Sequence, residues 1–175
     1  MKTLRSLLLI SAMVVASCAS EVQEQAADDQ YSTVEIDTTP RVTGIGGIFF
    51  RAKSPDSLRN WYGQHLGIAV SPFGSPFEFR NANDPEKVNY LIWNPFPDST
   101  NYFDPSDKEF MINYRVHNIE ALVDQLRTSG AVIVDTIAEY PYGKFVHVLD
   151  PEGNNFELWE PVDSTLTGMG GKTTK

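Results

Sequence analysis

The sequence predicts an α+β domain made of two tandem β-α-β-β-β units between residues 42 and 162 of the 175-residue chain. Two observations predict this fold class. A β-type run followed by a capped amphipathic segment occurs twice, and each time short strand-like runs and turn residues follow it. The two modules lie at about 42–97 and 109–162. Because internal repetition is a strong architectural signal, we expect one domain with two similar halves.

The first module opens with a β-type run at 42–50. A helix is predicted from Ser54-Pro55-Asp56, because a hydroxyl residue, a proline and an acid in that order are typical of helix starts. Gly67 ends this helix, and its apolar spacing predicts that Trp61 and Tyr62 belong to the core. Short strands are expected at 69–71, 77–80 and 88–94.

The second module repeats this plan. Residues 110–116 alternate apolar and polar side chains as a strand does, and Asn118 is placed to cap the following helix. Ile119 and Val123 belong to the apolar face of that helix, and Gly130 ends it. Strands are then expected at 132–138, 144–149 and 155–160, the last two joined by a turn at 150–154 that contains proline and glycine.

The first 17 residues are typical of a secretory signal peptide. Basic residues precede an apolar run at 7–16, which is shorter than the stretch of about 20 residues that a membrane-spanning helix needs. The run Val15-Ala16-Ser17-Cys18 resembles the bacterial lipobox, which implies cleavage before Cys18 and a lipid anchor on it. With Ala19 next, the resemblance implies a place in the cell envelope, at the outer membrane facing the periplasm. The alternative is an unmodified cysteine in a signal peptide that is cleaved slightly later.

The segments on either side of the domain do not read as folded. Residues 18–41 are polar, acidic and aperiodic, as expected of a flexible tether. Residues 163–175 are rich in Ser, Thr and Gly and are expected to form a loose tail. The chain has 14 basic and 23 acidic residues, a balance that argues against nucleic acid as a partner. Its only cysteine is Cys18, which excludes an intramolecular disulfide.

Motifs at both ends of the domain resemble the vicinal oxygen chelate superfamily, which includes glyoxalase I, bleomycin-resistance proteins and extradiol dioxygenases. The N-terminal motif is the first strand with Ser54-Pro55, Trp61-Tyr62 and His65-Leu66-Gly67. The C-terminal motif is the run DPEGNNFELWEP at 150–161. The resemblance implies two modules packed into a cupped, barrel-like mixed sheet around a central cavity. Because bleomycin-resistance proteins are usually dimers, it also raises a homodimer as a partner.

Metalloenzymes of this superfamily carry one ligand on the first and one on the last strand of each module. The resemblance places Gly47, Tyr90, Met111 and Glu157 at these four positions. Only Glu157 suits a hard divalent ion, because glycine has no side chain, a thioether is a soft ligand and a neutral phenol is a poor one. We therefore expect no cofactor, with a divalent metal as the disfavoured alternative.

The two-residue period of a strand predicts which other side chains point into the cavity with these four. Residues from the loop before the strand at 144–149, and from that strand, are expected to complete the wall. The predicted ligand-binding cavity is lined by Phe49, Tyr90, Ile92, Met111, Asn113, Arg115, Tyr142, Phe145 and Trp159.

Symmetric pairing across the turn at 150–154 sets Phe145 opposite Trp159 and His147 opposite Glu157. The second pair is a candidate catalytic acid–base couple, because a carboxylate can orient an imidazole. The alternative is a cross-strand pair that only stabilises the sheet. Arg115 is a candidate for binding a ligand carboxylate or phosphate. Its alternatives are a salt bridge to Glu157 or an exposed edge position.

The linker between the modules is aromatic and stiffened by prolines, with Tyr102 and Phe103 at its centre. It is expected either to cover the mouth of the cavity or simply to pack on the domain. The glycines at 44, 46 and 47 are costly inside a strand. They indicate either a close approach of other groups or a bulge.

Three functions are compatible with these features. The first is binding of a small apolar or aromatic molecule without the metal site, for which bleomycin-resistance proteins are a precedent. The second is an enzyme, either a glyoxalase-like lyase or isomerase or a dioxygenase-related enzyme, that uses His147 and Glu157. The third is a structural or interaction module of the envelope, since one fold hosts many functions.

Overall fold

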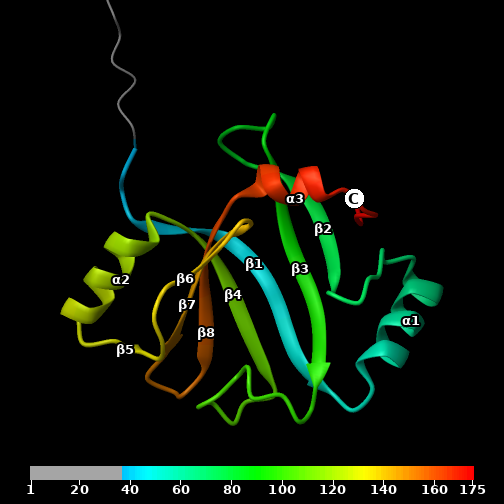
Figure 1. Cartoon of the computed structure of the whole chain (residues 1–175), viewed down its shortest axis with the longest axis horizontal. Helices are drawn as coiled ribbons and strands as arrows, with labels where there is room; N and C mark the ends of the chain where they lie inside the picture. The colour runs from blue at the N-terminus through cyan, green and yellow to red at the C-terminus, as the bar shows by residue number, and fades with distance from the viewer. Residues whose placement is uncertain (1–36) are drawn as a thin grey trace, which may run out of the picture. The chain divides into compact units, whose positions relative to one another are not determined.

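The computed structural model describes residues 37–175, shown in colour in Figure 1. The signal peptide, Cys18 and most of the tether lie outside these residues. In chain order the elements are β1 (Arg41–Ala52), α1 (Pro55–Leu66), β2 (Ser75–Arg80), β3 (Val88–Pro97), β4 (Phe110–His117), α2 (Ile119–Thr128), β5 (Val132–Ile133), β6 (Ala138–Tyr140), β7 (Gly143–Leu149), β8 (Asn155–Pro161) and α3 (Asp163–Met169).

The strands form one curved, unclosed mixed sheet in the order β2-β3-β1-β4-β8-β7-β5, with β6 paired to β7. Each module pairs its first and last strands in parallel, β1 with β3 and β4 with β8. The two modules meet along the antiparallel pair of β1 and β4. The predicted α+β class and the plan of two similar units are thereby confirmed. This arrangement brings β1, β3, β4 and β8, which carry the four ligand positions that the resemblance implies, to the middle of the sheet.

Two of the expected strands differ in detail. Residues 69–71 form no strand, and Ser71 only bridges to Gly74 in a tight turn. The stretch 132–138 is interrupted, so that β5 and β6 pair with different parts of β7. The interruption contains Asp135, whose carboxylate accepts a hydrogen bond from the backbone N–H of His147. At this point the backbone N–H of His147 therefore donates to a side chain and not to the backbone carbonyl of a neighbouring strand.

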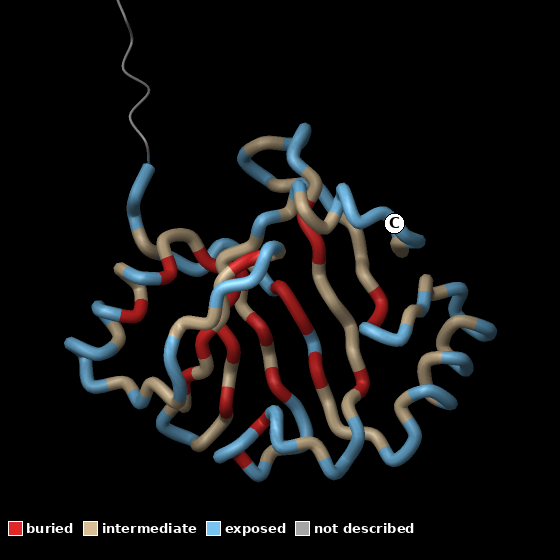
Figure 2. The backbone as a smooth tube through the Cα atoms, viewed as in Figure 1, coloured by how far each residue is buried: buried red, intermediate tan, exposed pale blue. Residues whose placement is uncertain are grey.

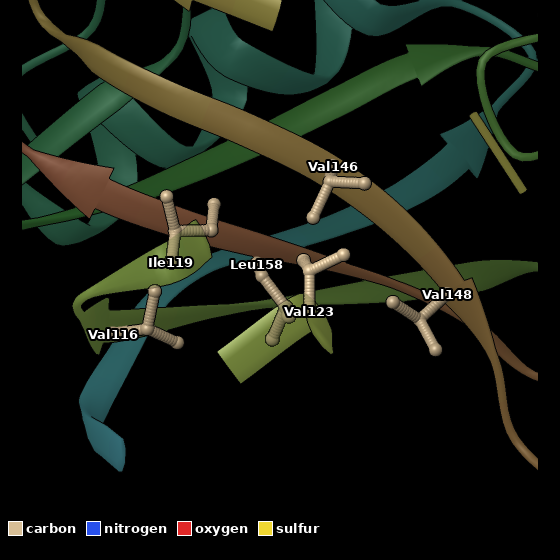
Figure 3. Packing of buried hydrophobic residues seen from close by; sticks show 6 residues of the cluster. All are labelled: Val116, Ile119, Val123, Val146, Val148 and Leu158. Carbon is tan, nitrogen blue, oxygen red and sulfur yellow. The ribbon is translucent and has the colours of Figure 1, made fainter. Parts of the chain in front are cut away.

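Helix α2 covers one face of the second module. Its buried residues Ile119 and Val123 pack on a cluster of sheet residues, as Figure 3 shows. The sheet side of this cluster consists of Val116, Val146, Val148 and Leu158. Burial of this apolar surface is what holds α2 in place. Successive side chains of a strand point to opposite faces of the sheet. The neighbouring side chains of β4, β7 and β8 therefore point to the face away from α2, which is called the inner face.

Helix α1 is attached less deeply, and none of its residues is buried (Figure 2). Tyr62 packs against Trp93 of β3, with ring centroids 4.7 Å apart. Trp61 is 49% exposed and stacks on His65 instead. The prediction that Trp61 belongs to the core is therefore wrong. Helical spacing correctly gave an amphipathic face, but the sheet offers α1 contact along only part of that face.

The C-terminal segment, for which the sequence predicts a loose tail, instead carries α3 near the start of β3 (Figure 1). Beyond α3, Thr174 adds to the edge of β2: it donates its N–H to the carbonyl of Pro76, and its carbonyl accepts from the N–H of Glu78. Its hydroxyl also accepts a hydrogen bond from the N–H of Ala69. Within residues 37–175, no helix is long and apolar enough to cross a bilayer.

Candidate functional site

The candidate site lies on the inner face of the second module, where three strands run side by side. The parallel register of β4 and β8 places Asn113 beside Glu157. The antiparallel register of β7 and β8 places His147 opposite Glu157 and Phe145 opposite Trp159. The register expected from the turn at 150–154 is confirmed. Asn113, His147 and Glu157 therefore meet at one point of the sheet.

Glu157 is the centre of this site and is only 1% exposed. One carboxylate oxygen accepts a hydrogen bond from the hydroxyl of Tyr102, and the other accepts one from Nδ2 of Asn113 at 2.5 Å. Burial raises the pKa of the Glu157 carboxyl above its ordinary value, although the bonds from Tyr102 and Asn113 and the charge of His147 oppose the rise. Burial therefore disfavours the charged form of this carboxyl group at a position that water hardly reaches.

His147 connects this carboxylate to the surface. Its Nε2 lies 3.5 Å from the nearer Glu157 oxygen, and its Nδ1 lies 2.7 Å from Oδ2 of Asp135. Because a carboxylate accepts hydrogen bonds, the contact with Asp135 requires a proton on Nδ1 of His147, and Nε2 is turned toward Glu157. That Nε2 is buried and has no hydrogen-bond partner among the described residues. Asp135, His147 and Glu157 thus form a chain from solvent to the buried centre.

The inter-module linker lies over this centre. Tyr102 stacks on Phe96 and meets the His147 ring edge to face, with centroids 5.0 Å apart. The neighbouring Phe103 is fully buried against Phe49 and Met111. Burial and the proximity of Glu157 raise the pKa of the Tyr102 phenol, so that this phenol keeps its proton as a donor. The linker therefore both packs on the domain and covers its inner face.

An aromatic wall continues from the centre along β7 and β8. Phe145 stacks on Trp159 at 5.7 Å, and Tyr142 meets Phe145 edge to face. Trp159 donates its indole N–H to the carbonyl of Tyr142. Two glycines make room for the indole, because a Cβ at Gly46 or at Gly143 would come closer than 3.0 Å to it. The register shifts in β1 show that the glycine run forms bulges as well as this close approach.

Arg115 is not free to bind a ligand in this structure, and its partner is not Glu157. The guanidinium is buried and forms a two-point contact with the carboxylate of Asp163, the first residue of α3. The alternatives for Arg115 that invoke Glu157 or an exposed edge are therefore wrong. Spacing within strands could not reveal this contact, because Asp163 lies beyond the last strand in a segment without a strong pattern.

The remaining predicted cavity residues fall into two groups. Phe49, Ile92 and Met111 belong to the apolar cluster around Phe103. Tyr90 donates or accepts a hydrogen bond with the hydroxyl of Thr167 on α3, at 3.0 Å. Tyr90 also lines a cavity of about 800 Å³ between α1, residues 67–70, β2 and the C-terminal residues 166–175. Of the nine predicted lining residues, Tyr90 alone borders that cavity.

The four positions at which the superfamily holds a metal do not fit one here. Gly47 offers no donor atom, and Met111 is fully buried in an apolar cluster. The Tyr90 hydroxyl is engaged by Thr167, and both oxygens of Glu157 already accept hydrogen bonds. Among residues 37–175, no group of three or more His, Cys, Asp or Glu side chains is arranged to hold a metal ion.

Comparison with known families agrees with this geometry. The family model described as "Glyoxalase-like domain" matches residues 47–159, and the chain belongs to this family. The match runs from the inner face of β1 to Trp159, so that it contains every residue of the Glu157 centre. The resemblance to the vicinal oxygen chelate superfamily is thereby confirmed. No curated protein matches the chain in sequence.

Solved structures with the same fold include enzymes of this superfamily. A variant of Streptomyces coelicolor methylmalonyl-CoA epimerase in complex with 2-nitronate-propionyl-CoA is 13% identical, with a TM-score of 0.51 over 70% of this chain and 99% of that one. The Mn(II)-bound glyoxalase from Novosphingobium aromaticivorans is 16% identical, with a TM-score of 0.50 over 78% of this chain. The match covers 42% of that glyoxalase. At these identities the likeness shows the fold alone.

Proposed function

We propose that the domain binds a small molecule with an apolar or aromatic part on the inner face of its second module, without the metal site of the superfamily. The observation that supports this most directly is the Glu157 centre: a buried carboxylate held by Tyr102 and Asn113, next to an aromatic wall. A few convergent polar groups within apolar surroundings are the usual composition of a small-molecule site. Tyr102 lies over the centre and would have to move aside for a ligand to reach Glu157.

We also propose that this binding takes place at the cell envelope. The support is the order of segments in the sequence, with a signal-like start, a lipobox-like run ending at Cys18 and an acidic stretch before the domain. A protein anchored through several acyl chains stays on its membrane, whereas a protein anchored through a single acyl chain binds the membrane only marginally. Mass spectrometry of the protein from the membrane fraction tests for the lipid on Cys18. In a separate fractionation, we expect the Cys18→Ser variant to be released from the membrane.

The binding proposal is tested with purified protein in two measurements. Metal content is measured first, and we expect less than stoichiometric divalent metal. A thermal-shift screen with phenol, indole and benzamide then tests binding, because a ligand stabilises the fold by RT ln(1 + [L]/Kd). Tyr102→Phe should increase the shift, since it keeps the ring but loses the hydroxyl bond to Glu157 that holds Tyr102 over the centre.

The matched control is Tyr114→Phe. Tyr114 packs against Phe156 in the cluster beneath α2, on the opposite face of the same sheet. This variant should bind the probes as the unmodified protein does. Tight stoichiometric metal bound through Glu157, or an equal thermal shift in both tyrosine variants, would contradict the proposal.

Proton transfer is a second candidate function, favoured by the Asp135–His147–Glu157 chain. A buried carboxylate coupled through an imidazole to the surface can take a proton from a bound molecule and return it. Exchange of a carbon-bound hydrogen for deuterium detects such a step without knowledge of the product. We expect NMR in D2O to show this exchange in bound carbonyl compounds with an acidic C–H, such as acetophenone, and Glu157→Gln to abolish it. Exchange that persists in Glu157→Gln would exclude this role.

A further inference from the structure

Arg115 forms a preorganised carboxylate-binding site on the inner face. Its side chain is 5% exposed and its guanidinium lies over the Trp159 ring, 5.2 Å from the centroid. Nη1 donates to the carbonyl of Tyr90 at 3.0 Å, and Nη2 donates to Oδ1 of Asn89 at 3.3 Å. These contacts fix the plane of the guanidinium. Two further N–H groups are left pointing at a single carboxylate, the geometry by which arginine selects carboxylates.

The carboxylate that fills this site belongs to a weakly attached element. Nη1 and Nη2 of Arg115 contact the two oxygens of Asp163 at 3.0 and 2.5 Å. The side chain of Asp163 is 22% exposed, and α3 has seven residues, none of them buried. The arginine is thus fixed by the sheet, whereas its partner is held by a short surface helix.

The surroundings of α3 leave space for it to move. The cavity of about 800 Å³ borders Leu166, Thr167 and Gly170 of this segment, together with Tyr90 of the sheet. The bond between the hydroxyls of Tyr90 and Thr167 is a further polar tie from α3 to β3. Displacement of α3 would break the contacts of Asp163 with Arg115 and of Thr167 with Tyr90, and would open the Arg115 site toward this cavity.

Arg115 and the Glu157 centre lie on the same face of the sheet. Arg115 lies beside Trp159 in the sheet register, and Asn113 lies beside Glu157. Residues two apart on one strand point to the same face and have Cα atoms roughly 6.4–6.8 Å apart. A carboxylate bound at Arg115 would consequently lie on the same face of the sheet as the Glu157 centre.

We propose that Arg115 is the carboxylate-binding group of this inner face, occupied by Asp163 in the resting protein and by the carboxylate of a ligand when α3 lifts. This inference rests on the proposed binding function and adds the ligand class: a small carboxylic acid with an apolar or aromatic body. Asp163 acts as an internal competitor of that ligand. Lifting of α3 and ligand binding are thereby coupled.

The test compares the unmodified protein with Asp163→Asn by isothermal titration with benzoate, acetate and benzyl alcohol. If Asp163 fills the site at least nine-tenths of the time, its removal should strengthen benzoate binding by about tenfold or more, since apparent affinity scales with the fraction of competent protein. Asp124→Asn is the matched control, because Asp124 pairs with Arg127 in an exposed contact on α2. This control should bind benzoate as the unmodified protein does.

A second measurement does not depend on the stability of the variant. Hydrogen exchange of the amides of residues 163–169 in the unmodified protein should accelerate when benzoate is added. Equal benzoate affinity in Asp163→Asn and the unmodified protein, or unchanged exchange in α3, overturns the inference. Acetate that binds Asp163→Asn as tightly as benzoate would overturn the apolar or aromatic body as part of the ligand class. Benzyl alcohol that binds as tightly as benzoate would overturn the carboxylate class and leave the proposed binding function standing.

Discussion

Replacement of Phe103 by alanine should remove a large part of the stability of the domain. Phe103 of the linker is fully buried against Phe49 and Met111, and its ring centroid lies 5.4 Å from that of Phe96. Truncation of a buried phenylalanine costs about 3–5 kcal/mol. The ring also lies under the guanidinium of Arg51, a contact worth roughly 0.5–1 kcal/mol. We therefore expect a loss in the upper half of that range, about 4–5 kcal/mol.

This loss is to be compared with a total free energy of unfolding of about 5–15 kcal/mol for a typical domain. Urea denaturation followed by tryptophan fluorescence measures it as a lower midpoint at unchanged slope. Phe73→Ala is the matched control: this phenylalanine also lies outside the helices and strands but is 87% exposed, so its loss should change stability by no more than about 0.5 kcal/mol. A cost below about 2 kcal/mol for Phe103→Ala would refute the idea that the linker is wedged into the inner face.

Two further predictions concern the Glu157 centre and the glycines around Trp159. Because burial raises the folded-state pKa of Glu157, its contribution to stability is fully present below the ordinary carboxyl pKa and is lost as pH rises through the raised value. In thermal melts, the melting temperature of Glu157→Gln should therefore rise relative to that of the unmodified protein as the pH increases. Plots of melting temperature against pH that run parallel for the two proteins would contradict this. Gly143→Ala should cost about 3 kcal/mol or more in urea denaturation, since Gly143 has φ 141° and a Cβ there would meet Glu160 and Trp159. Gly153→Ala, which has φ 76° but open space, should cost only about 1–2 kcal/mol, and equal costs for both glycines would show that the indole is not tightly enclosed.

Part of the site could be derived from the sequence because it depends on local regularity. The turn at 150–154 fixes how β7 and β8 pair, and alternation along a strand fixes which side chains share a face. Together they place His147 opposite Glu157 without knowledge of the rest of the fold. The types of residue at the ligand positions are equally visible in the sequence. No packing can give Gly47 a donor side chain or turn the Met111 thioether into a hard donor.

The partners of these residues were beyond such reasoning. Asp135 reaches His147 from an interruption between two short strands, and Tyr102 reaches Glu157 from the linker. Asp163 reaches Arg115 from a segment that composition alone marks as loose. None of the three occupies a position with a strand or helix period. Their contacts are set by the path of irregular backbone over the sheet.

The sequence by itself thus determined the two-module order, the strand register around Glu157 and the absence of suitable donors at three of the four family positions. Only the tertiary structure decided what covers the inner face and which charges meet there. The physical reason is that periodicity and turn chemistry act between near neighbours in the chain. A buried ion pair or a wedged aromatic ring, by contrast, depends on where segments about 50 residues apart come to rest on each other.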